Sequence, residues 1–89
     1  ESLNYLQLKY TIKDYNQKNY TLAYNSFKNL ANEDLQNTVN KEEIQINSIA
    51  MFYIALCKLN GDGTKKDEHY TFSVIEFLEN KNKFSDALK

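Results

Sequence analysis

The chain has 89 residues and a mass of 10.5 kDa, the size of one domain, which excludes a two-domain protein. Its 12 acidic residues and 11 basic residues, all of the latter lysine, give a net charge of −1 and no general field for a polyanion, so we predict that it does not bind nucleic acid. Proline is absent, and the only glycines are Gly61 and Gly63. Because the helix breakers sit at one place, we predict a mostly helical fold with one special turn.

The chain also lacks the signals of a membrane-spanning or disulfide-rich protein. Its longest apolar run, residues 49–57, is well short of the roughly 20 residues that cross a bilayer. Cys57 has no second cysteine to pair with, and its apolar surroundings predict a small buried residue. The chain begins with Glu1, so we expect that the natural N-terminus is missing and that the domain is soluble, in a compartment that the sequence leaves open: cytoplasmic, periplasmic or secreted. The richness in Asn, Lys, Ile and Tyr without Arg is typical of an A+T-biased genome, which favours a bacterial source.

A first helical hairpin is predicted over about residues 2–32. Apolar residues recur at spacings of three and four over residues 2–15, which is the period of a helix. Asn19 is the predicted N-cap of a second helix that continues to Ala31. The short polar connection between the two helices favours antiparallel packing.

A second hairpin is predicted over about residues 41–80, after a polar linker at 33–40. Asn40 and Glu43 form a capping-box pattern at the start of a helix that is apolar on most sides, so we expect this helix to be central and covered on more than one face. Gly61 is predicted to close it in the left-handed conformation, and Asp67 to cap the next helix. A short separate helix is expected at about 82–89.

The two hairpins show a weak internal repeat. At an offset of fifty residues, the second and fourth predicted helices align Tyr20, Thr21 and Phe27 with identical residues. A hairpin alone leaves an apolar face uncovered, and stacking would complete the core. The predicted fold is therefore all-α: one domain, residues 1–89, of antiparallel helical hairpins stacked as a short α-solenoid of about two repeats plus a terminal helix.

The second hairpin resembles the Sel-one-like repeat, a relative of the tetratricopeptide repeat. Ala50 stands at the first alanine of that pattern, Ile54-Ala55 where Leu-Gly is usual, and Gly61, Gly63 and Asp67 match its loop. Lys58, Thr64 and Thr71 depart from it. The first hairpin is similar to a plain tetratricopeptide unit, whose small and aromatic packing positions are matched by Tyr20, Ala23, Phe27 and Ala31.

The resemblance implies a scaffold or adaptor that binds a protein or peptide partner on a concave surface lined by the first helix of each hairpin. The side chains expected to face the partner are Asn4, Lys9, Lys13, Asn47 and Tyr53. Lysine and asparagine can hold a carboxylate or a backbone group of the partner. The alternative is an end fragment or cap of a longer solenoid that mediates self-association, which exposed Leu3, Phe84 and Leu88 would favour.

No pattern in the sequence predicts catalysis, a cofactor or a metal. His69 has no second His or Cys at the spacing of a metal pair, which favours a solvated surface residue. The loop at 60–71 fails as a calcium site, because Lys65 stands where Gly is required and Thr71 where a bidentate Glu is required. Some bacterial relatives of the Sel-one-like type are associated with penicillin hydrolysis, but they tend to pair cysteines across each hairpin. We therefore predict that the chain is not an enzyme.

Overall fold

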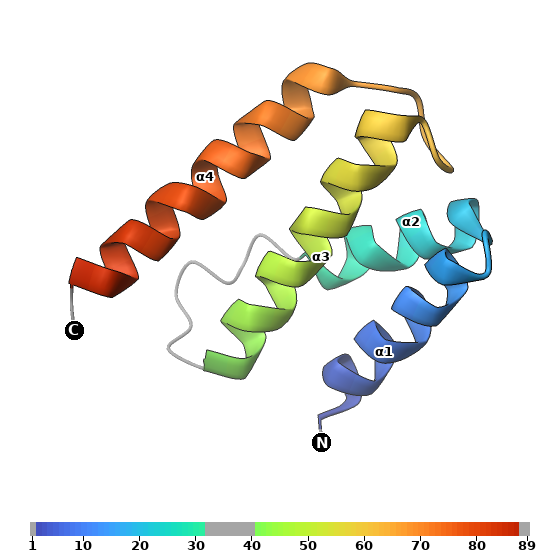
Figure 1. The fold of residues 1–89 in the computed structure, drawn as a ribbon. Helices are drawn as coiled ribbons and strands as arrows, with labels where there is room; N and C mark the ends of the chain where they lie inside the picture. Colours follow the sequence, from blue (N-terminus) through green and yellow to red (C-terminus); the bar gives the residue numbers. More distant parts are fainter. Residues whose placement is uncertain (1, 32–40, 88–89) are drawn as a thin grey trace.

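The structure, a computed structural model, describes residues 2–31 and 41–87, and the side chains of the last helix at 68–76 and 79. Within those ranges it is all-α, which confirms the predicted fold class, and contains no β-strand. The described helices are α1 (Leu3–Asn16), α2 (Tyr20–Leu30), α3 (Lys41–Asn60) and α4 (Glu68–Ala87) (Figure 1).

Helix α3 is the centre of the arrangement. It contacts α1, α2 and α4, whereas α4 contacts α3 alone among the described helices. In the view of Figure 1, α2 passes behind α3, while α1 and α4 lie to either side of it. One long face of α3 is therefore packed on the first hairpin, and the opposite face points towards the viewer.

The core lies where α1, α2 and α3 meet. Its buried side chains come from all three helices: Leu8, Ala23, Phe27, Leu30, Ile46, Ala50 and Ile54. The ring of Tyr53 stacks on that of Phe27, with centroids 4.7 Å apart, and meets the ring of Tyr15 edge-on at 5.3 Å. Aromatic pairs of these geometries add roughly 0.5–1.5 kcal/mol each beyond the apolar area that they bury. The contacts among these three rings thus stabilise the packing of α3 on the first hairpin.

The first helix of each hairpin ends in the same way. Gly61 follows α3 with φ +73°, as predicted, and Asp62 N–H donates to Cys57 O at 2.8 Å. Lys18 follows α1 with φ +69°, and Asn19 N–H donates to Asp14 O at 2.9 Å. In both cases a left-handed residue lets the chain bond back across the last turn of the helix. Lys18 and Gly61 are therefore equivalent, and α1 corresponds to α3 at an offset of 43 residues.

The second helix of each hairpin starts differently. Asp67 Oδ1 accepts from Tyr70 N–H at 3.1 Å, which confirms the predicted cap of α4. Asn19 is the N-cap residue of α2, which confirms its predicted position, but its side chain makes no capping hydrogen bond, so the hydrogen bond expected of an N-cap is wrong. Measured from Asn19 to Asp67, α2 corresponds to α4 at an offset of 48, which replaces the sequence alignment at fifty.

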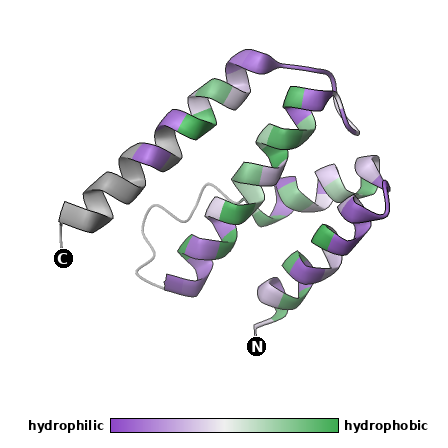
Figure 2. Ribbon diagram, in the orientation of Figure 1, coloured by the Kyte–Doolittle hydropathy of each residue, from purple (hydrophilic) through white to green (hydrophobic). Residues whose placement is uncertain are grey.

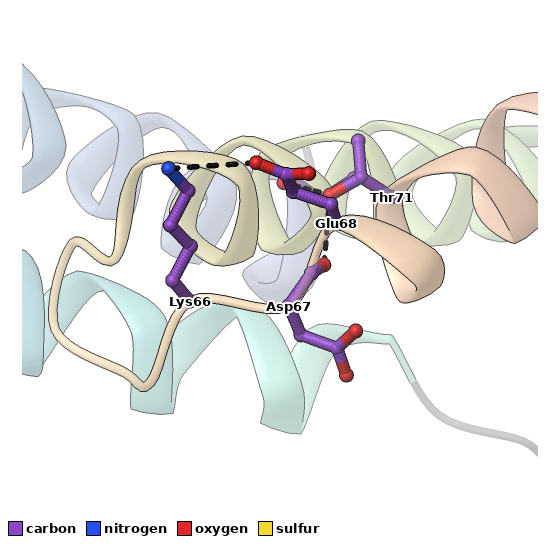
Figure 3. A network of polar contacts seen from close by, with 5 residues as sticks. Lys66, Asp67, Glu68 and Thr71 are labelled. Carbon is purple, nitrogen blue, oxygen red and sulfur yellow. Dashed lines mark hydrogen bonds and ion pairs between the residues drawn. The ribbon is translucent and has the colours of Figure 1, made fainter.

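The junction of α3 and α4 is tied down by polar contacts (Figure 3). Thr71 Oγ1 donates to Ala55 O at 2.9 Å, and Asp67 N–H donates to Lys58 O at 2.7 Å. The exposed ion pair of Lys66 with Glu68, at 3.5 Å, adds little because solvent screens it. The first turn of α4 is thus held beside the last turns of α3.

The predicted terminal helix at 82–89 is corrected by the structure, because α4 continues without a break to Ala87. The predicted boundary, between the second hairpin ending at about 80 and the helix at 82–89, contains neither glycine nor proline. Asparagine lowers helix propensity by less than about 1 kcal/mol and need not end a helix. The predicted linker at 33–40 and the capping residue Asn40 lie outside the described residues, as does Leu88.

Candidate partner-binding surface

The described residues contain no group of three or more His, Cys, Asp and Glu side chains that could hold a metal ion. His69 is exposed on the first turn of α4. Cys57 is buried, and its burial, with a smaller contribution from Asp62, raises its pKa to about 11. A thiol with so high a pKa is protonated at neutral pH and is a poor nucleophile.

One surface of the molecule is an apolar line along α3, which we call the α3 stripe: Ile49, Phe52, Leu56 and Leu59. Steps of three and four residues keep these side chains on one face of the helix. Phe52 and Leu59 are 47% and 36% exposed, and the other two are half-buried. The buried residues Ile46, Ala50 and Ile54 lie on another face, against the first hairpin, and Ile49, at the edge of the α3 stripe, also packs against that core. The exposed Phe52 and Leu59 of the α3 stripe therefore lie on a different face of α3 from the one that meets α2, the helix that passes behind α3 in Figure 2.

Two lysines continue this surface on α1. At the offset of 43, Lys9 and Lys13 take the positions on α1 that Phe52 and Leu56 take on α3. Both lysines are exposed, and Lys9 Nζ lies 4.7 Å from the centroid of the Tyr5 ring. Because α1 and α3 are in contact, we expect equivalent positions on the two helices to lie on the same side of the pair.

The other three residues predicted to face a partner are placed differently. Asn4 is exposed near the start of α1. Asn47 is half-buried, with its amide nitrogen 3.7 Å from Met51 sulfur. Tyr53 is half-buried and its ring is occupied by Phe27 and Tyr15. The structure therefore brings Lys9 and Lys13 together and leaves Tyr53 as a packing residue of α3.

The α3 stripe is absent from the sequence prediction. The sequence predicts a central helix covered on more than one face, because residues 44–59 are apolar on most sides. The missing signal is the step pattern itself: residues 46, 50, 54 and 57 fill one face, and 49, 52, 56 and 59 fill another. The first of these faces meets the first hairpin, whereas the second keeps Phe52 and Leu59 exposed.

Most residues proposed as repeat positions are structural. Ala23, Phe27, Ala50 and Ala55 are buried, and Tyr20 is half-buried with its ring 5.3 Å from that of Tyr15. Gly63 has φ +71° and approaches the backbone of Tyr20 and Thr21 so closely that an added Cβ would lie 2.7 Å from Thr21 N. The turn of the second hairpin thus rests on the first turn of α2.

Comparisons of the chain with protein-family models, with curated proteins and with solved structures find no match. None of the described helices is long and apolar enough to cross a membrane.

Proposed function

We propose that this chain is a protein-interaction scaffold that binds a segment of a protein partner along the α3 stripe, on the surface that α1 and α3 share. The observation that carries the proposal is the exposed second apolar face of α3. Contact of large apolar side chains with water is unfavourable. Covering them with the apolar side chains of a partner would stabilise the complex by roughly 25 cal/mol per Å² of apolar area buried.

The surface also has a charge pattern that selects the segment. Lys9 and Lys13 stand on α1 beside the apolar side chains of α3, and both are exposed. The complementary segment carries apolar side chains at helical spacing along one face, to cover Phe52 and Leu59, and acidic side chains at the edge that meets α1. Its carboxylates would find the lysines at the rim, where charges contribute more to specificity than to affinity.

The arrangement of the helices supports the same function. The first helices of the two hairpins, α1 and α3, contact each other directly, and α2 lies behind α3. This is the arrangement that the resemblance to tetratricopeptide-type repeats implies for a surface lined by the first helix of each hairpin.

Selection from a phage-displayed library of random peptides tests the proposal with the 89-residue chain as bait. The selected peptides are expected to be amphipathic and acidic, and to bind Phe52→Asp at least about tenfold more weakly, because a carboxylate at the centre of the contact cannot be desolvated cheaply. The double variant Lys9→Glu, Lys13→Glu is expected to weaken acidic peptides and to spare neutral ones. Affinities are measured by fluorescence anisotropy.

The matched control is Leu22→Asp, which places the same charge on an exposed apolar residue of α2, away from the α3 stripe. Circular dichroism establishes that each variant is folded. Peptides that bind the Phe52→Asp and Leu22→Asp variants equally well, or a library that yields no peptide sensitive to Phe52→Asp, would overturn the proposed function.

A further inference from the structure

A second exposed line of side chains runs along α4, on the side of the molecule beyond α3. We call it the α4 stripe: Glu68, Phe72, Ile75 and Glu79. Phe72 is 67% and Ile75 42% exposed, and both glutamates are exposed. The spacing of four, three and four residues places all of them on one helix face, with two apolar side chains between two carboxylates.

The first hairpin shows what such a line does when it is covered. At the offset of 48, the α4 stripe corresponds to Tyr20, Tyr24, Phe27 and Ala31 of α2. Phe27 is fully buried and stacked on Tyr53 of α3, and Tyr24 and Ala31 pack against the same core. The position taken by buried Phe27 on α2 is thus taken by exposed Ile75 on α4. Helix α4 presents the face that α2 presents to α3, but no described helix lies on it.

The side of α1 turned away from the core has the matching character. At the offset of 43, Leu3, Gln7 and Tyr10 correspond to Ile46, Ala50 and Tyr53, the residues with which α3 docks on the first hairpin. Leu3 is 85% and Tyr10 64% exposed. A bulky aliphatic residue and a tyrosine seven residues later therefore occur at the same places on both helices, covered on α3 and exposed on α1.

Charge fits the same pairing. Lys9 and Lys13 flank Tyr10 on α1, whereas the α4 stripe begins and ends with Glu68 and Glu79. We infer that the α4 stripe is occupied by α1 of a second copy of this chain, with Tyr10 of that copy against Ile75 as Tyr53 lies against Phe27 within one chain. The contact repeats between two copies the packing that joins the two hairpins of one copy.

Such a contact is heterologous, because it joins two different surfaces. Each copy offers one α4 stripe and one outward face of α1. A pair of copies therefore still has one free surface of each kind, and further copies can add to form an open stack. The α3 stripe takes no part in the contact, and Lys9 and Lys13 are the residues that this contact shares with the proposed partner-binding surface. The variants that test the inference therefore lie on neither the α3 stripe nor these lysines.

Sedimentation equilibrium of the full 89-residue chain, followed to millimolar concentration, tests the inference. The unmodified chain is expected to increase in mean mass beyond a dimer as its concentration rises. Tyr10→Asp and Phe72→Asp are each expected to remain monomeric, since each destroys one of the two surfaces. An equimolar mixture of these two variants is expected to form a dimer and nothing larger, because one intact surface of each kind remains.

Leu22→Asp is the control for a charge on an unrelated exposed apolar site, and Phe52→Asp for the α3 stripe; both are expected to associate like the unmodified chain. Leu3→Asp provides a second variant of the α1 face if Tyr10→Asp fails to fold by circular dichroism. An unmodified chain that stays monomeric at millimolar concentration overturns the inference and leaves the proposed function intact. Self-association that survives Phe72→Asp, or a mixture of the two variants that does not dimerise, also overturns it.

Discussion

Gly63 occupies a place where two separate constraints exclude a side chain. Its φ of +71° lies in the left-handed region, which costs other L-residues about 1–2 kcal/mol. An added Cβ would also meet the carbonyl of Tyr20 and lie 2.7 Å from Thr21 N, and both belong to helix backbone that cannot step aside cheaply. Gly61 has the same sign of φ, but the nearest atom to its added Cβ is Lys66 Cβ at 3.6 Å, an ordinary contact.

We therefore expect Gly63→Ala to lower the free energy of unfolding by about 3 kcal/mol, and Gly61→Ala by only about 1 kcal/mol, since the second variant has the backbone cost alone. Urea unfolding followed by circular dichroism measures both. Equal losses for the two variants would show that the second turn does not rest on α2 as the structure places it.

The buried thiol of Cys57 has a pKa well above its usual value. Burial raises its pKa from 9.0 to about 11, so the folded chain holds the proton more tightly than the unfolded chain. Raising the pH then favours unfolding, and the stabilisation, complete below pH 9, is lost as the pH rises towards about 11. Tyr15 and Tyr70, whose pKa values are also raised chiefly by burial, add to the loss at the upper end.

The free energy of unfolding is expected to fall between pH 9 and pH 11 with a limiting slope of about 1.4 kcal/mol per pH unit from this thiol. Cys57→Ala removes that part of the slope and leaves the part due to the tyrosines. Chemical denaturation at a series of pH values measures both chains; parallel pH profiles would contradict the assignment to Cys57.

Single residues were predictable from the sequence where chemistry restricts the choice. The left-handed Gly61 and the capping Asp67 follow from properties that belong to those residue types in any chain. The close approach of Gly63 to Tyr20 was not predictable, because it depends on how one hairpin lies on the other, and a local pattern carries no record of that distance.

At the level of the helices, the N-caps of α2 and α4 differ, and we expect the two caps to contribute differently to the free energy of unfolding. Asp67 accepts a hydrogen bond from Tyr70 N–H, whereas the side chain of Asn19 accepts none. We expect Asp67→Ala to lower the free energy of unfolding by about 1 kcal/mol, and Asn19→Ala, the matched control, by a few tenths at most. Thermal and urea unfolding measure both. A larger loss for Asn19→Ala would contradict these caps.

The helix boundaries show where sequence patterns are informative. Periodicity located α1, α2 and α3, because each has a face that is buried and therefore apolar at regular steps. It failed at the end of α4, because the pattern predicts a separate helix at about 82–89 whereas α4 continues to Ala87. Periodicity also concealed the α3 stripe, since a helix with two apolar faces has almost no net amphipathic direction, and only packing distinguishes the covered face from the exposed one.

For the whole molecule, the sequence predicted the class of fold better than the correspondence between its halves. Identity between Tyr20 and Tyr70 suggested an offset of fifty, but the caps of α2 and α4 set it at 48 and the left-handed residues after α1 and α3 set it at 43. The second turn is longer than the first, so no single offset can align both helices of a hairpin. The equivalence between α2 and α4, from which the role of the α4 stripe is inferred, can therefore be established only from the structure.

The seating of Gly63 against Tyr20 and Thr21 has a mechanical consequence. It places the turn of the second hairpin on the turn of the first, so both are joined at one edge of the molecule, while α4 leaves that edge with α3 as its only described neighbour. Any rotation of α4 would take this edge as its pivot, and the 20 residues of α4 would act as a lever about 30 Å long. A turn of about 10° at the pivot would displace the far end by about 5 Å. Small changes in the packing of the turn at Gly63 would thus change the angle between successive copies in a stack that forms through α4.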